Sequence, residues 1–255
     1  MSHDRRIFEK NVPASGEFVL APDNAHYLAT VLRLKAGDPL TVIDEASADA
    51  FECFLVEVAP HTVRVQISHR HASVEYHSRV RILLPALCKA EANELILEKA
   101  TELGVSNMIF WQSQRSVLRL KDQSDIEKKV TRFKKITASA AKQSGRRTMP
   151  AVHIAESLDA AFLLAQQMTL LSESFLGLLS LESEAKPVRA YQTVLEAKGS
   201  AVLAVGAEGD FDPSEVVVFK ERGFLPVSLG GNRLRAETAA LAGICAIDAV
   251  LSPLT

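Results

Sequence analysis

Two glycine-containing corners are the segments of this sequence best suited to bind a ligand. They read VGAEGDFDPSE at 205–215 and SLGGNRLRAETAA at 228–240, and each follows an apolar run. Glycine at a corner lets the backbone approach a ligand closely, and ligands of open parallel sheets bind at the carboxyl ends of the strands. Similar turns occur throughout α/β proteins, so the pattern alone leaves a structural role open.

The common phosphate-binding and nucleophile motifs are absent from the sequence. It contains no GxxxxGK[ST], no GxGxxG after an early strand, no serine nucleophile elbow and no HExxH. This argues against P-loop enzymes, NAD-binding Rossmann domains and the common methyltransferase fold. The three cysteines have no CxxC spacing, and no acidic or thiol cluster accompanies His69, His71 and His77. We therefore expect neither a disulfide framework nor a metal site.

Residues 1–73 are predicted to form a small β-barrel. A helical stretch from Ala25 to Leu34 precedes three short β-rich runs separated by turn residues. These runs are 39–44, 51–58 and 61–67. The polar segment 68–78 is the expected linker, with exposed histidines.

Residues 74–255 alternate between strand-like and helix-like runs, which indicates an α/β domain with a mostly parallel sheet. Strands are predicted at 81–87, 105–111, 168–174, 200–206 and 224–230. Helices are predicted at about 91–103 and 236–251, after a capping box of Ser124 with Glu127, and after a second cap of Asp212, Pro213 and Glu215.

Positive charge is concentrated in the middle of the chain although the formal net charge is −2. Residues 79–150 carry 15 Lys+Arg against 7 Asp+Glu. Apolar residues spaced by three and four, from Ile126 to Ala140, direct most of the lysines of this region to the opposite faces of a helix. This face is either a phosphate-binding surface or an ordinary solvated one. The first twenty residues lack the long apolar run of a membrane segment, so we expect a cytoplasmic protein.

Several landmarks, in the expected order, resemble the RsmE family of the knotted SPOUT methyltransferase superfamily. GAEGD at 206–210 and LGGNRLRAETA at 229–239 resemble the family's GPEGG and LGxRILRTETA segments. Earlier landmarks are Lys89 with EKATELGV at 98–105, Arg115 with Ser116 and Val117, and QSGR at 143–146. The resemblance covers almost the whole chain.

This resemblance implies a PUA-like RNA-binding barrel at 1–73 and a SPOUT trefoil-knot methyltransferase domain at 74–255. It also implies S-adenosylmethionine as cofactor, a homodimer, and N3 methylation of one uridine in small-subunit rRNA within the assembled 30S subunit. The cofactor-binding residues carried over are Gly206, Glu208, Gly209, Leu229, Gly230, Leu234, Arg235 and Thr238, with Leu171, Ser172 and Glu173 as a third loop at the end of an earlier strand.

Uracil N3 must lose its proton before it can attack a methyl group. Arg235 is our candidate for stabilising the resulting anion, and Glu208 or Glu237 for accepting the proton or orienting the arginine. A structural ion pair between Arg235 and Glu237 is the alternative. The RNA-binding candidates are Lys89, Arg115, Gln143, Arg146 and Arg147; for the two adjacent arginines a solvated turn is the alternative.

Departures from the family pattern keep other functions open. Ala207 and Asp210 replace the proline and last glycine of GPEGG, Arg233 replaces an aliphatic residue, Ala236 replaces threonine and Lys142 replaces glutamate. Loss of the proline frees the backbone of the cofactor loop, and Asp210 adds charge beside it. A degenerate RNA-binding or ribosome-assembly protein and a knotted methyltransferase acting on tRNA therefore remain alternatives.

Overall fold

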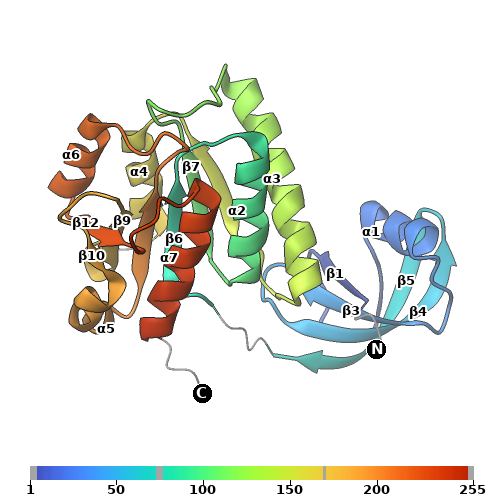
Figure 1. The fold of residues 1–255 in the computed structure, drawn as a ribbon. Helices are drawn as coiled ribbons and strands as arrows, with labels where there is room; N and C mark the ends of the chain where they lie inside the picture. The colour runs from blue at the N-terminus through green and yellow to red at the C-terminus, as the bar shows by residue number, and fades with distance from the viewer. Residues whose placement is uncertain (1–4, 73–76, 169–170, 252–255) are drawn as a thin grey trace. The chain divides into compact units, whose positions relative to one another are not determined.

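The computed structural model describes residues 5–72, 77–168 and 171–251 (Figure 1). The chain divides into two compact units. The N-terminal unit comprises Met1–Glu75 and Ala141–Met149, and the C-terminal unit comprises Tyr76–Ala140 and Pro150–Thr255. The predicted domain boundary between 73 and 74 lies outside the described residues. The return of 141–149 to the N-terminal unit was not predicted.

The N-terminal unit contains a five-stranded sheet in the order β1-β3-β4-β5-β2. Its strands are β1 (Arg6–Glu9), β2 (Glu17–Val19), β3 (Pro39–Asp44), β4 (Ala50–Ala59) and β5 (Thr62–His71). The three predicted runs are confirmed as β3, β4 and β5. The two additional strands are too short to show a period of two in the sequence.

The helical stretch predicted between residues 25 and 34 is confirmed, with an irregular form. Helix α1 (Pro22–His26) runs directly into a π-helical turn, Tyr27–Val31. Arg33 then takes a left-handed φ of 53°, which ends the helix. Leu28 is fully buried in the core of this unit, beside Ile7, Val42 and Val65.

The predicted linker at 68–78 is wrong at its amino end, because residues 68–71 continue β5. Because the side chains of residues 68–71 are polar, the sequence did not indicate that they belong to a strand. In the structure, β5 pairs with β4 (Ala50–Ala59). His69 and His71 are exposed on β5, and Nε2 of His71 lies 3.0 Å from Oε1 of Glu52.

The C-terminal unit is built on a seven-stranded sheet in the order β10-β12-β9-β11-β6-β7-β8. All neighbouring pairs are parallel, as predicted. The strands are β6 (Val80–Pro85), β7 (Asn107–Trp111), β8 (Ala151–Ala155), β9 (Phe175–Leu179), β10 (Lys186–Pro187), β11 (Ala201–Val205) and β12 (Leu225–Ser228). Four of the predicted strands correspond to β6, β7, β11 and β12.

The strand predicted at 168–174 is wrong. Met168 ends helix α4 (Leu158–Met168), and Leu171–Glu173 is a 3-10 turn that precedes β9. Gly177 interrupts the apolar pattern of β9, and it lies in a tightly packed place: a Cβ there would lie 3.1 Å from Cδ1 of Leu203. The strand therefore begins later in the sequence than its apolar pattern indicates.

Helices cover both faces of this sheet (Figure 1). One core contains side chains of α2 (Ala90–Glu102), α3 (Gln123–Ser144), α5 (Gln192–Lys198) and α7 (Ala236–Leu251). The opposite core contains side chains of α4 and α6 (Pro213–Glu221). None of the helices in the described ranges has the length and apolarity to cross a membrane.

The predicted helix starts are confirmed in one case and shifted in another. The capping box of Asp212 and Glu215 at the start of α6 is confirmed, with Pro213 in the first turn. The cap predicted at Ser124 is wrong by two residues: Asp122 Oδ1 accepts a hydrogen bond from the backbone N–H of Asp125 at 2.8 Å. An aspartate before the helix satisfies the same free N–H groups as a serine would.

Candidate functional site

A cavity opens at the carboxyl ends of β9, β11 and β12, which are neighbours in the sheet. Both predicted glycine corners contribute to its wall. Its lining residues are Leu179, Ser180, Leu181, Val205, Gly206, Ala207, Glu208, Asp210, Val227, Leu229, Gly230, Asn232, Arg233, Leu234, Ala236 and Ala239.

The loop after β11 forms a tight turn, here called the β11 turn (Gly206–Asp210). The backbone N–H of Asp210 donates to the carbonyl oxygen of Ala207 at 2.9 Å. Asp210 has a φ of 65°, a left-handed conformation that aspartate tolerates better than most residues. A Cβ on Gly206 would lie 3.1 Å from backbone atoms of Asp210 and Phe211, so this glycine is required sterically.

The loop after β12 supplies the second wall. Gly230 has a φ of 127°, which L side chains rarely adopt. Arg233 and Leu234 line the cavity, whereas Arg235 does not. Arg235 is exposed just before α7, and its carbonyl oxygen accepts from the N–H of Ala239 at 2.8 Å. The described residues contain no ion pair between Arg235 and Glu237, so that alternative is not supported.

The expectation that Leu171, Ser172 and Glu173 form the third loop is wrong. They precede β9 and so lie at its amino end, opposite to the cavity, where the Ser172 carbonyl accepts from Nζ of Lys198. The third segment that lines the cavity is Leu179–Leu181, at the end of the same strand. Because the strand was predicted at 168–174 and not at Phe175–Leu179, the loop after it was also predicted too early in the sequence.

Glu208 contacts the start of α2. Its Oε1 accepts a hydrogen bond from the backbone N–H of Lys89 at 2.8 Å. Cys88, which is fully buried, lies beside it. Burial raises the pKa of the Cys88 thiol to about 12, and the charges of Glu208 and Glu237 add to the rise. Two of the predicted catalytic carboxylates therefore lie near one buried thiol.

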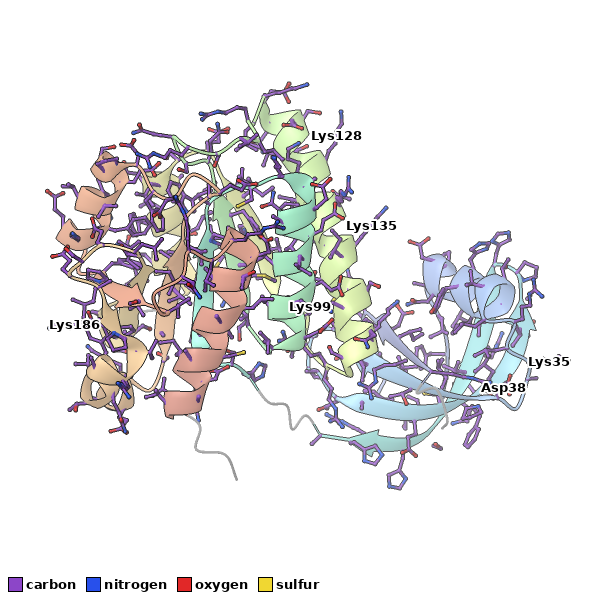
Figure 2. The ribbon with its side chains drawn as sticks, viewed as in Figure 1. Lys35, Asp38, Lys99, Lys128, Lys135 and Lys186 are labelled. Carbon is purple, nitrogen blue, oxygen red and sulfur yellow. The ribbon has the colours of Figure 1, made fainter. Side chains whose placement is uncertain are left out.

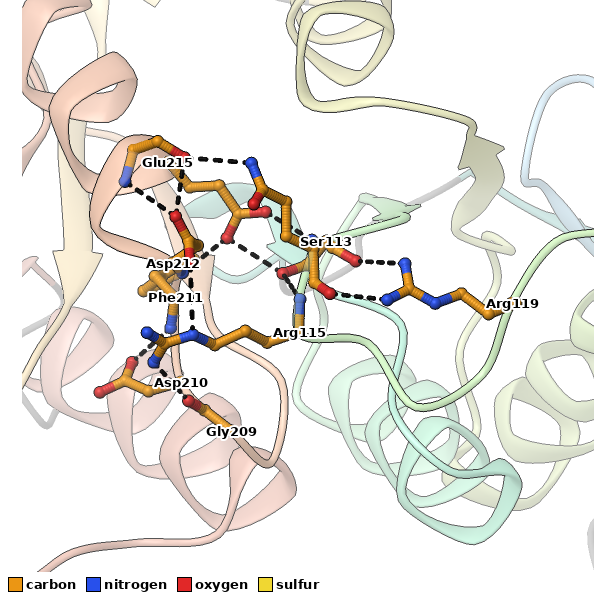
Figure 3. Close-up of polar contacts among 10 residues, drawn as sticks. Ser113, Arg115, Arg119, Gly209, Asp210, Phe211, Asp212 and Glu215 are labelled. Atoms are coloured by element: carbon orange, nitrogen blue, oxygen red, sulfur yellow. Dashed lines mark hydrogen bonds and ion pairs between the residues drawn. The ribbon is translucent and has the colours of Figure 1, made fainter.

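A polar network joins the loop after β7 to the start of α6 (Figure 3). Arg115 Nη1 donates to the carbonyl oxygen of Gly209 at 3.0 Å, and its Nε lies 3.6 Å from Oδ2 of Asp212. Glu215 accepts from the Ser113 hydroxyl at 3.0 Å and from the Gln114 backbone N–H at 2.7 Å. Hydrogen bonds from Ser214 and the charge of Arg115 hold the pKa of Asp212 below its ordinary value.

The predicted RNA-binding residues differ in exposure. Lys89, Arg115 and Gln143 are exposed. Arg146 is only 6% exposed and donates to Thr148 Oγ1 at 3.1 Å, so it is not part of a solvated turn; its RNA-binding role stays a prediction. Arg147 is half-buried and donates to the carbonyl oxygen of Ala72 at 2.8 Å. Charge in the sequence did not reveal that these arginines make structural contacts within the N-terminal unit.

The basic face of α3 is confirmed. Ile126, Phe133 and Thr137 are buried, and the lysines lie on the other faces of the helix. Figure 2 shows Lys128 and Lys135 projecting from α3. Lys128, Arg132, Lys134 and Lys135 are exposed, although Arg132 forms an ion pair with Glu94.

Comparisons with known proteins agree with this architecture. Residues 76–248 match the model of an RNA methyltransferase domain, and residues 20–68 match that of an RNA methyltransferase PUA domain. The ribosomal RNA small subunit methyltransferase E of Bacillus subtilis is 30% identical over 251 residues, which cover 95% of this chain and 93% of that protein. The protein of the same name from Mycobacterium bovis is 29% identical and covers 92% and 87%.

Solved structures show the same fold. Ribosomal RNA small subunit methyltransferase E from Neisseria gonorrhoeae, bound to S-adenosyl methionine, superposes with a TM-score of 0.84 at 27% identity, covering 96% of this chain and 97% of that one. A methyltransferase from Legionella pneumophila in complex with SAM gives 0.83 at 26% identity, covering 96% of both chains. The α/β fold is therefore that of the SPOUT methyltransferases, and the chain belongs to the ribosomal RNA small subunit methyltransferase E family.

Proposed function

We propose that this protein transfers a methyl group from S-adenosylmethionine to N3 of one uridine in small-subunit rRNA. The observation that carries the proposal is the cavity at the carboxyl ends of β9, β11 and β12, with glycine loops in its wall, in a member of this family. Open parallel sheets bind their ligands at this edge.

The residues that line the cavity fit the proposed cofactor in their chemistry. Leu179, Leu229 and Leu234 supply apolar surface for an adenine ring. Glu208 and Asp210 supply negative charge for a ligand that carries a sulfonium and an amino group.

The departures from the family pattern are compatible with an active enzyme. Asp210 takes the left-handed conformation for which the family uses glycine, so the turn keeps its shape. Ala207 is 5% exposed and packs in the core with Phe211. These contacts favour an active methyltransferase over a degenerate RNA-binding protein.

Bound S-adenosylmethionine supplies an electrophilic methyl group. Arg235 would stabilise the uracil anion by donating to the carbonyl oxygens of the base. The Arg235 guanidinium could do so because it has no hydrogen bond or ion pair with another described residue. Glu208, on the cavity wall, would accept the N3 proton, and Glu237 in the first turn of α7 is the second candidate. N3 then forms its bond to the methyl carbon as the sulfur–carbon bond breaks.

The partners belong to the same proposal. The RNA substrate would be the small-subunit rRNA within the assembled 30S subunit, with the exposed lysines of α3 near its phosphates. The enzyme would act in the cytoplasm as a homodimer. Sedimentation equilibrium tests for the dimer. A monomer mass at micromolar protein concentration would contradict it.

The function is tested by methyl transfer from labelled S-adenosylmethionine to small ribosomal subunits that lack N3-methyluridine. The labelled nucleotide is then mapped. Label at a single uridine N3 is expected. Cofactor binding without transfer to these subunits would redirect the search to another RNA, and absence of cofactor binding would overturn the proposal.

A further inference from the structure

We propose that Arg115 is a positioning residue that holds the β11 turn in its cofactor-binding shape. The inference rests on the proposed function, and it gives Arg115 a role other than the RNA contact expected from the sequence. It follows from where the guanidinium is directed and from what holds it there.

The guanidinium of Arg115 contacts the chain on both sides of Asp210. Its Nη1 donates to the carbonyl oxygen of Gly209 at 3.0 Å, and its Nε lies 3.6 Å from Oδ2 of Asp212 (Figure 3). The Asp212 carboxylate neutralises part of the positive charge with which Arg115 would otherwise bind an RNA phosphate. The Arg115 side chain therefore contacts both Gly209, which precedes the left-handed Asp210, and Asp212, which caps α6.

This contact orients the peptide that enters the left-handed conformation. The Gly209 carbonyl is directed to Arg115, while the next N–H, that of Asp210, donates to Ala207 at 2.9 Å. Each bond fixes one end of the same peptide plane. Since Ala207, Glu208 and Asp210 line the cavity, the orientation of this peptide shapes the cavity wall.

Arg115 is itself held in place by a buried acid. Glu215 is 6% exposed and accepts hydrogen bonds from Ser113, Gln114 and the Asp212 N–H, the last at 2.8 Å. The Ser113 hydroxyl in turn accepts from the Arg115 backbone N–H at 3.1 Å. The loop after β7 and the start of α6 are thus joined, which reduces the entropy lost when Arg115 binds the turn.

The loop after β7 is also closed on its other side. Arg119 donates to the carbonyl oxygens of Ser113 at 3.2 Å and Gln114 at 2.7 Å. The two arginines therefore differ in role: Arg119 closes its own loop, and Arg115 extends from that loop to the β11 turn.

The experiment measures cofactor and RNA binding separately on the full-length protein. Calorimetry gives the Kd for S-adenosylmethionine, and filter binding gives the affinity for small ribosomal subunits. Arg115→Ala should raise the cofactor Kd about tenfold, the usual cost of one hydrogen bond from a charged group. Arg115→Lys should raise it nearly as much, because an ammonium cannot contact both partners in the same geometry. RNA affinity should stay within about twofold of the wild type.

Two further variants separate positioning from general destabilisation. Arg222→Ala removes an exposed arginine that pairs with Asp159 at 2.8 Å, away from the β11 turn, and should leave the cofactor Kd unchanged. Asp212→Asn keeps a residue suited to the N-cap but removes the charge facing Arg115, and should raise the cofactor Kd by a smaller factor. This variant carries the test if Arg115→Ala does not fold.

The outcomes are distinct. A folded Arg115→Ala protein with wild-type cofactor affinity would overturn the inference, as would reduced RNA affinity with intact cofactor binding. A wild-type protein that binds no S-adenosylmethionine would instead overturn the proposed function.

Discussion

The carboxylate of Glu208 accepts the backbone N–H of Lys89 at 2.8 Å, so a residue of the β11 turn occupies the amino end of helix α2. The same side chain lines the cavity. A helix amino end favours a negative charge through its free N–H groups and its dipole. The proposed proton acceptor therefore also has a structural contact, and variants must separate the two.

Glu208→Gln and Glu208→Ala separate them. Glutamine keeps an oxygen for the Lys89 N–H but is a far weaker base, so it should lower kcat at least about a hundredfold with little loss of stability. Alanine should also lower the free energy of unfolding by about 1 kcal/mol. Rapid-quench methyl transfer and urea unfolding measure the two effects. If Glu208→Gln has the wild-type kcat, Glu208 is not the proton acceptor and its role is limited to the structural contact with Lys89.

Arg235 and Arg233 form a matched pair on one loop. Arg235→Ala should lower kcat about a hundredfold, because a charge that stabilises the uracil anion is lost, with little change in cofactor Kd. Arg233→Ala should raise the cofactor Kd, since Arg233 lines the cavity and Arg235 does not. Single-turnover kinetics and calorimetry distinguish them. Normal turnover by Arg235→Ala would remove it from the mechanism.

Gly206 tests the shape of the β11 turn. The Cβ of Gly206→Ala would lie 3.1 Å from backbone atoms that cannot move independently, so we expect a loss of about 1–3 kcal/mol in stability and weaker cofactor binding. Gly231→Ala is the control, because a Cβ there meets no atom within 4 Å. Thermal unfolding with and without cofactor compares them, and equal behaviour would contradict the steric argument.

The basic face of α3 predicts salt-sensitive RNA binding. Reversing Lys128 and Lys135 to glutamate should weaken binding to small ribosomal subunits. In a plot of log affinity against log salt concentration, the magnitude of the slope should also fall by about one for each phosphate that the helix no longer neutralises. Lys186→Glu, which reverses one exposed lysine on β10, is the control for charge reversal outside α3. Equal salt slopes for the wild type and the double variant would show that α3 is an ordinary solvated face.

Cys88 predicts a pH dependence of stability. Its thiol has a pKa of about 12 in the fold and an ordinary value of 9.0. Its contribution to stability is complete below pH 9 and is lost as the pH rises toward 12, because the unfolded chain then releases the proton first. Relative to Cys88→Ala, the wild type should lose up to about 1.4 kcal/mol per pH unit above about pH 9. Equal pH dependence of unfolding in the wild type and Cys88→Ala would contradict this argument.

Local signals in the sequence predicted much of the fold. The capping box of Asp212 and Glu215 and the glycines of both corners depend on neighbouring residues only, and the structure has them where the sequence placed them. The catalytic and RNA-binding roles of individual residues stay predictions.

Signals that depend on distant packing were missed. Gly177 lies within β9, where a Cβ would lie 3.1 Å from Cδ1 of Leu203 on the neighbouring strand; it interrupts the apolar pattern, and the third loop was therefore predicted at Leu171–Glu173. Arg146 appeared to be a surface charge, yet the fold buries it. Likewise, nothing near Ala141 in the sequence shows that it packs with Phe8 and Ile43.

Glu215 connects the dynamics of two segments. Because its carboxylate accepts from Asp212 at the helix start and from Gln114 in the loop after β7, local opening of either segment would break bonds in the other. Amide hydrogens in the first turn of α6 would then exchange with solvent at the rate at which the loop after β7 opens. Cofactor affinity and local unfolding near the cavity would change together, so a substitution far from the bound methyl group can alter how long the site stays assembled.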